Sequence, residues 1–188
     1  MTDYQKLYDG ISKAAWGYFF VYFNINIGTV SILPAFIGYI LFFSSINLLK
    51  DEERELSLLG TLCVILGLWN GAVWLASWVG IKLEGMWQFL DIVICLINLY
   101  FNFQLLTNLA SIASKHQPEG YELDAKLLRY RTLQTVMLTA ITMVTCLYPW
   151  LSEVWTIISV IMLVVYVIAC ICLMKALFNL RRCLSTNE

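Results

Sequence analysis

Five stretches of this chain are long, apolar and nearly free of charge, and they limit its possible folds more than any other feature. Only Asp91 and Lys175 are charged within them, and they cover residues 32–49, 56–81, 86–113, 133–150 and 154–180. A helix that crosses a bilayer needs about 20 mainly apolar residues. Of the 188 residues, 60% are hydrophobic and 13% are charged, which is too apolar for one water-soluble core of this size. We therefore predict an all-α, polytopic transmembrane helix bundle that forms a single domain over residues 1–188.

A sixth apolar stretch, residues 14–27, is shorter than the others. Its 14 residues correspond to about 21 Å of helix, against a hydrocarbon core of about 30 Å. It ends at Asn24, Asn26 and Gly28, which predict a break before the next helix. The helix could extend back to about Tyr4 and cross the membrane, lie at the interface, or form a re-entrant half-span. We predict six hydrophobic helices and leave these three placements of the first one open.

The lysines and arginines are distributed unevenly enough to predict an orientation. Cytoplasmic loops of membrane proteins collect these residues. If all six helices cross the membrane, 11 of the 12 lie on one side and only Lys82 lies on the other, whereas a first helix that does not cross gives a split of 9 to 3. We therefore predict a multi-pass protein of the cell membrane with six spans and both termini in the cytoplasm.

Polar side chains follow one face of the predicted helix over residues 86–113. The residues Gln88, Asp91, Cys95, Asn98 and Asn102 are separated by 3, 4, 3 and 4 positions, so a helix places them on one narrow stripe. The other faces carry apolar residues, among which we place Phe101. Polar groups in hydrocarbon must meet protein or water, and we therefore expect the stripe to point into the bundle.

Asp91 is the acid that we place inside a span, and its role has two interpretations. A carboxylate within a membrane is a functional hypothesis by default, and the stripe could then be a cation or proton site or a polar cavity for a small ligand. Alternatively, Asn98 and Asn102 form hydrogen bonds between helices, and Asp91 is merely wetted near the outer boundary. Both interpretations stay open at this point.

The helix predicted before this one offers a partner for the stripe. Gly67 and Gly71 form a GxxxG pattern, which lets helix backbones approach closely in a membrane. Asn70 lies on nearly the same face, and we expect it to form a hydrogen bond with Asn98. We add Asn70 to the candidate stripe on this basis.

Several classes of protein and site are disfavoured by the sequence. No HExxH, GxSxG or glycine-rich phosphate loop is present, so we expect no catalytic residue and regard an enzyme as the less expected class. His116 is the only histidine and falls in a polar loop apart from the cysteines, so no metal or cofactor is expected. The net charge of −1 gives no basic surface for a nucleic acid.

Residues 24–39 read NINIGTVSILPAFIGY. This N-x-G-T…LP…GY stretch resembles the opening of small, uncharacterised multi-pass membrane proteins of low-GC Gram-positive bacteria, in which it joins a short first helix to a second one. The resemblance covers about 25 residues near the N-terminus. It implies a bacterial cytoplasmic membrane and assigns no activity or site residue.

Three hypotheses for the function follow. The first is a non-enzymatic bundle that binds or transports a small solute or ion, or that acts as an accessory subunit of a membrane complex. The second is a structural or regulatory membrane subunit without a ligand. The third is a membrane-embedded enzyme that acts on lipid or a cofactor. The expected partners are the lipid bilayer and either another membrane protein or further copies of this chain.

Overall fold

The computed structural model describes residues 4–23, 26–27, 30–31, 34–81, 88–118, 120–147 and 153–185. It contains six α-helices and one two-stranded antiparallel pair in which Asn26 faces Ser31 and Ile27 faces Val30. The elements in chain order are α1 (Tyr4–Tyr22), β1 (Asn26–Ile27), β2 (Val30–Ser31), α2 (Ala35–Leu49), α3 (Leu56–Trp78), α4 (Gln88–His116), α5 (Leu123–Leu147) and α6 (Glu153–Ser185). The predicted all-α fold class is confirmed, apart from this short strand pair in the predicted break.

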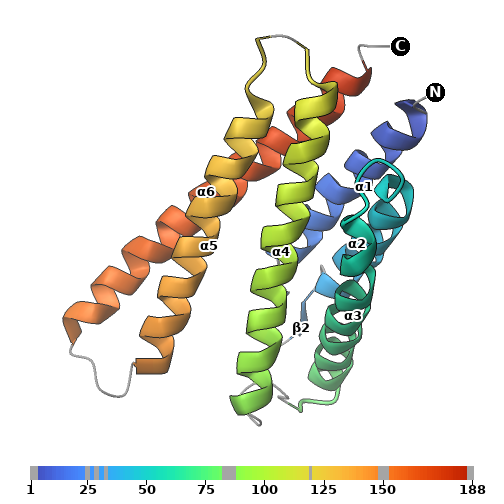
Figure 1. The fold of residues 1–188 in the computed structure, drawn as a ribbon. Coiled ribbons are helices and arrows are strands. Elements are labelled where there is room, and N and C mark those ends of the chain that lie inside the picture. The colour runs from blue at the N-terminus through green and yellow to red at the C-terminus, as the bar shows by residue number, and fades with distance from the viewer. Residues whose placement is uncertain are drawn as a thin grey trace.

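The helices run up and down and form a closed ring. Each helix packs against the next one in the chain, and α1 also packs against α6. Figure 1 shows that the start of α1, the end of α6 and the α2–α3 and α4–α5 connections share one end of the bundle. We call this the terminal end, and we call the end at which α3 and α5 finish the opposite end. The up-and-down order therefore gathers the charged connections at the terminal end.

Three helices are long and apolar enough to cross a membrane: α3, the Phe89–His116 part of α4 and the Ile157–Leu184 part of α6. The apolar helix α2 is shorter, with bounds at Ala35 and Leu49. We expected six such helices, and three of the described helices meet this criterion. The helix α5 starts at Leu123 instead of residue 133 and includes Arg131, Gln134 and several threonines, which lower its mean hydropathy.

The helix α1 starts at Tyr4 and ends at Tyr22, which agrees with the predicted break and with one of the alternatives left open, an extension back to about Tyr4. It lies backbone to backbone against α2. A Cβ atom on Gly38 would lie 2.7 Å from the carbonyl oxygen of Gly17, and one on Gly10 would lie 2.6 Å from Leu49. The buried hydroxyl of Ser45 also donates a hydrogen bond of 2.7 Å to the carbonyl oxygen of Gly10. Small residues therefore allow α1 to pack closely along the length of α2.

The buried core is concentrated toward the terminal end. It includes Leu7, Ile11, Leu49, Leu56, Leu109, Leu127, Leu177 and Leu180. In contrast, no described residue is buried in the stretches 67–81, 89–100, 135–144 and 157–168, which form the opposite-end halves of α3 to α6. The bundle is thus tightly packed at one end and leaves much apolar surface at the other.

The α2–α3 connection is fastened to the end of α4 by its acidic residues. Glu53 accepts hydrogen bonds from Ser111 at 2.8 Å and from Lys115 at 3.0 Å. His116 lies 3.3 Å from a carboxylate oxygen of Glu52, at the last position of α4 rather than in the loop where we expected it. The hydrogen bonds from Ser111 and Lys115 lower the pKa of Glu53.

Candidate functional site

Two members of the predicted stripe, Asn98 and Asn102, lie at a contact between α4 and α2. The hydroxyl of Tyr39 donates a hydrogen bond of 3.0 Å to Oδ1 of Asn98. Asn102 is buried, and its Nδ2 donates to the same Oδ1 at 2.7 Å and to the carbonyl oxygen of Asn98 at 2.8 Å. These two asparagines therefore face protein.

The rest of the stripe has other neighbours. The Sγ atom of Cys95 lies 3.7 Å from Oγ1 of Thr142 on α5. Asp91 is half-buried in the first turn of α4, about 10 Å along the helix from Asn98. Gln88 begins α4, and its side chain lies outside the described residues. The structure therefore brings Asn98 and Asn102 together and leaves Asp91 nearer the opposite end.

One expectation about this region was wrong. Asn70 donates a hydrogen bond of 2.8 Å to the carbonyl oxygen of Leu66 on its own helix and does not form the expected bond with Asn98. The reason is that α2 occupies this position and supplies Tyr39 as the donor. Phe101 is fully buried and packs against the rings of Tyr39 and Phe42, at centroid distances of 6.0 and 5.6 Å.

A cluster of tyrosines lies beside this asparagine pair. The rings of Tyr18 and Tyr22 on α1 are 4.4 Å apart, and the ring of Tyr22 lies 6.4 Å from that of Tyr166 on α6. Gln134 on α5 is close to the hydroxyls of Tyr22 and Tyr166, and Cys170 is close to those of Tyr18 and Tyr166. Tyr22 and Tyr166 also lie near Tyr39, so the tyrosines and the asparagine pair are neighbours. We define the polar cluster as Tyr18, Tyr22, Tyr39, Asn98, Asn102, Gln134, Tyr166 and Cys170.

Four atoms of the polar cluster are buried without a hydrogen bond of ordinary length: the hydroxyls of Tyr18 and Tyr22, Oδ1 of Asn102 and Nε2 of Gln134. Gln134 nevertheless lies near the hydroxyl of Tyr22, and Cys170 lies near that of Tyr18. They come from α1, α4 and α5. A buried polar group left unpaired costs about 1–3 kcal/mol, so these atoms would gain from closer hydrogen-bond partners. Tyrosine, asparagine, glutamine and cysteine side chains are neutral near pH 7. The cluster is therefore able to donate and accept hydrogen bonds without carrying a charge.

Apolar side chains close the polar cluster toward the terminal end. Beyond Asn102, α4 continues with Leu105 and Leu109, and beyond Cys170, α6 continues with Leu173 and Leu177. All four leucines are buried. Because the opposite-end halves of α3 to α6 contain no buried residue among those described, the cluster lies between a sealed half and a loosely packed half.

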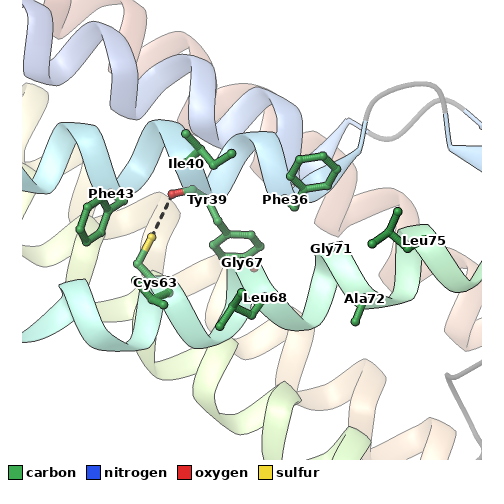
Figure 2. Close-up of a pocket in the computed structure, with 11 residues that line it drawn as sticks. Phe36, Tyr39, Ile40, Phe43, Cys63, Gly67, Leu68, Gly71, Ala72 and Leu75 are labelled. Atoms are coloured by element: carbon green, nitrogen blue, oxygen red, sulfur yellow. Dashed lines mark hydrogen bonds between the residues drawn. The ribbon is translucent and has the colours of Figure 1, made fainter.

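An apolar groove of about 520 Å³ lies outside the ring, between α2 and α3. Figure 2 shows Tyr39 turned toward Gly67 in this groove, with Gly71 farther along the same helix. Cys63 also lines the groove, and its thiol donates a hydrogen bond of 3.1 Å to the carbonyl oxygen of Tyr39. Tyr39 thus contributes its ring to the groove and its hydroxyl to the polar cluster.

Sequence reasoning identified the asparagines of the cluster and missed its tyrosines. A signal was present, because Tyr18 and Tyr22 are four residues apart, as are Tyr166 and Cys170, and each pair therefore shares a helix face. A tyrosine within an apolar stretch combines an aromatic body with a hydroxyl that needs a partner when buried. These pairs indicated inward faces on α1 and α6.

Within the part of the chain that the structure describes, no group of three His, Cys, Asp or Glu residues is arranged to hold a metal ion. The polar cluster offers neutral oxygen and nitrogen atoms and a thiol, which suit hydrogen bonding better than the binding of a hard cation. Comparison of the chain with protein-family models, curated proteins and solved structures finds no match.

Proposed function

We propose that this protein is a multi-pass membrane protein that binds and transports a small, uncharged solute with hydrogen-bonding groups. The observation that carries the proposal is the set of four unpaired polar atoms inside the helix ring. A solute with hydroxyl, amide or carbonyl groups would supply their missing partners. A fold that only needed packing would gain by replacing these groups with apolar ones.

The neutral chemistry of the polar cluster favours an uncharged solute over an ion. Asp91 lies about 10 Å from Asn98 along α4, so the one acid that we placed in a span is not part of the cluster. The position of the cluster also favours transport, since it lies between the buried leucines of the terminal end and the less packed half of the bundle. Movement of the half formed by α1, α2 and α3 against the other half would alternately expose the cluster.

The proposal is tested by the substitution Gln134→Leu in proteoliposomes. Swelling assays with urea, glycerol and erythritol measure the entry of neutral solutes. We expect the wild-type protein to accelerate the entry of at least one of them, and Gln134→Leu to remove this effect while the melting temperature stays equal or rises. Removing an unpaired polar group relieves its cost to the stability of the fold, whereas the solute loses a hydrogen-bonding contact.

The matched control is Thr132→Val, which changes an exposed position on the same helix and should leave the entry of solutes unchanged. Permeability no higher than that of protein-free liposomes for all three solutes would contradict the proposal. A large loss of stability in Gln134→Leu would also contradict it, because it would show that the glutamine has a structural partner.

We further propose that all six helices cross the membrane with the terminal end in the cytoplasm. The antiparallel order and the packing of α1 along α2 support this, as does the gathering of basic residues at one end. Cysteines introduced for Asp51 at the terminal end and for Ile81 at the opposite end, both exposed, test it with a membrane-impermeant thiol reagent. Only the cysteine at position 81 should react in intact cells, and reaction at position 51 would contradict the orientation.

A second candidate function, an accessory subunit of a membrane complex, is favoured by the groove between α2 and α3. The groove is apolar and includes Gly67 and Gly71, whose lack of side chains admits a neighbouring helix. A Gly71→Leu variant would fill the groove while leaving the polar cluster unchanged. Loss of a co-purifying membrane protein with retained solute entry would support this candidate, and unchanged co-purification would oppose it.

A further inference from the structure

A polar cavity, separate from the polar cluster, lies at the terminal end between α1 and α6. It has a volume of about 200 Å³ and is lined by Tyr8, Phe178, Arg181 and Arg182. Two adjacent arginines therefore border one small cavity, and none of the described residues that line it is acidic. This gives the cavity a local positive charge, although the whole chain has a net charge of −1.

The guanidinium of Arg181 is held in a defined position. Its Nε donates a hydrogen bond of 2.9 Å to the hydroxyl of Tyr8. Its Cζ lies 5.1 Å from the centre of the Tyr8 ring and 6.0 Å from that of Phe178. The bond uses only the Nε hydrogen, which leaves the terminal nitrogens for another acceptor. Among the described residues, no carboxylate lies within the 4.0 Å of an ion pair with Arg181.

We infer that this cavity binds the phosphate group of an anionic phospholipid. A planar guanidinium that is fixed by a ring and a hydroxyl matches the oxygens of a phosphate in a two-pronged contact. Basic pockets between membrane helices on the cytoplasmic side are suited to anionic headgroups. The cavity belongs to the end at which the basic residues of this chain gather, which is where such headgroups would lie.

The surroundings of the cavity favour a lipid over free phosphate. Trp16 is 44% exposed, and its ring packs edge-on against Phe178 at a centroid distance of 5.5 Å. Farther toward the opposite end, α6 exposes Val164, Val167 and Ile168. The exposed side chains along α1 and α6 thus change from arginine through aromatic rings to aliphatic groups, in the order of the headgroup, interface and acyl chains of a phospholipid.

The test is native mass spectrometry of the full chain released from vesicles of equal parts phosphatidylglycerol and phosphatidylcholine. We expect the wild-type protein to retain phosphatidylglycerol in preference to phosphatidylcholine. In the double variant Arg181→Gln, Arg182→Gln, the bound phosphatidylglycerol should fall at least about tenfold, as expected when a charge-assisted contact is lost. The control Lys126→Gln, Arg129→Gln removes two exposed cations of α5 and should retain the lipid as the wild type does.

Three outcomes would overturn the inference. They are equal retention by wild type and double variant, equal retention of the two lipids, and displacement of phosphatidylglycerol by millimolar inorganic phosphate, which would assign the cavity to free phosphate. If the double variant does not fold, Tyr8→Phe provides the test, because it frees Arg181 and keeps both charges. That variant should fold and lose part of the preference for phosphatidylglycerol, and an unchanged preference would count against the inference.

Discussion

The hydroxyl of Tyr39 on α2 donates a hydrogen bond of 3.0 Å to Oδ1 of Asn98 on α4, so these two residues join two helices that are not consecutive in the chain. The same Oδ1 accepts Nδ2 of Asn102 at 2.7 Å. One carboxamide oxygen therefore satisfies donors from two positions. This bond also joins the three-helix half that contains α2 to the half that contains α4.

Removal of this bond should destabilise the protein measurably. Tyr39→Phe keeps the ring in the α2–α3 groove and deletes only the donor. We expect a loss of about 0.6 kcal/mol and at most about 1.7 kcal/mol, as found for hydrogen bonds between membrane helices, in thermal unfolding of the detergent-purified protein. The control Tyr100→Phe alters a tyrosine on α4 that is 56% exposed and should have little effect. Equal effects of the two substitutions would show that the bond to Asn98 contributes no stability.

The carboxamide of Asn98 should contribute more to stability than the neighbouring apolar side chain of Ile97. Asn98→Leu leaves the hydroxyl of Tyr39 without its acceptor and removes one of the two acceptors of the Asn102 amide, and we expect a loss on the order of 1–2 kcal/mol. Ile97→Leu, one position along α4, preserves side-chain volume and should be tolerated better. The comparison is made by unfolding both variants in the same detergent. An Asn98→Leu protein as stable as Ile97→Leu would contradict the inward position of Asn98.

The contact between α1 and α2 should tolerate no added methyl group. In Gly38→Ala the new Cβ would meet the carbonyl oxygen of Gly17 at 2.7 Å, and the backbones must separate, so we expect a loss of about 1–3 kcal/mol as for an overpacked core. In Gly71→Ala the nearest atom is Cβ of Phe36 at 3.9 Å, an ordinary contact. That variant should be neutral or slightly stabilised by the helix preference of alanine. Thermal unfolding of the two glycine variants decides between these expectations.

Hydrophobic length and charge determine much of this fold and are readable from the sequence. The break after Tyr22 and the positions of α3, α4 and α6 follow from them, whereas the extension of α1 back to Tyr4 was one of three placements left open. The close contact between Gly17 and Gly38 was not predicted, because the sequence analysis considered only the GxxxG pattern of Gly67 and Gly71 as a site of close helix packing. Gly10 and Gly17, the glycines of α1 that approach α2, are seven residues apart in the sequence. The pairing of α1 with α2 is revealed only by the structure.

The polar cluster was predictable only in part for a related reason. Periodicity along α4 places Asn98 and Asn102 on one face, because it depends on a single helix. Whether Tyr39 or Asn70 meets Asn98 depends on which helix lies opposite, and that is determined by the packing of all six. The tyrosines Tyr18, Tyr22 and Tyr166 come from helices at the two ends of the chain, so no local pattern could bring them together.

The contact between the acidic connection and α4 should give stability a dependence on pH. The pKa of Glu53 is lowered below its usual 4.5 by the hydrogen bonds from Ser111 and Lys115. A carboxyl with a lowered folded-state pKa contributes stability above the unfolded-state value, and this contribution is lost as the pH falls through the folded-state pKa. The melting temperature of wild type should therefore exceed that of Glu53→Gln at pH 7, and the difference should shrink below pH 4.5.

The control for Glu53 is Glu122→Gln, which changes an exposed glutamate before α5. It should follow the wild-type melting temperature at every pH. Contacts that both proteins share, such as that of Glu52 with His116, cancel in the comparison. A difference between wild type and Glu53→Gln that stays constant from pH 7 to pH 3 would show that Glu53 acts through packing and not through its charge.

The role of Asp91 distinguishes the neutral-solute proposal from an ion site. Asp91→Asn preserves the shape and much of the hydrogen bonding of the side chain while it removes the charge. Because the polar cluster consists of neutral groups and lies about 10 Å away along α4, we expect the variant to fold as the wild type does and to keep both the rate of neutral-solute entry and its dependence on pH. The measurement is the proteoliposome swelling assay at pH 5, 6 and 7, alongside thermal unfolding. If solute entry instead became independent of proton concentration, or was abolished in a folded Asp91→Asn protein, the carboxylate would be part of the transport site and the solute would move with a cation or proton.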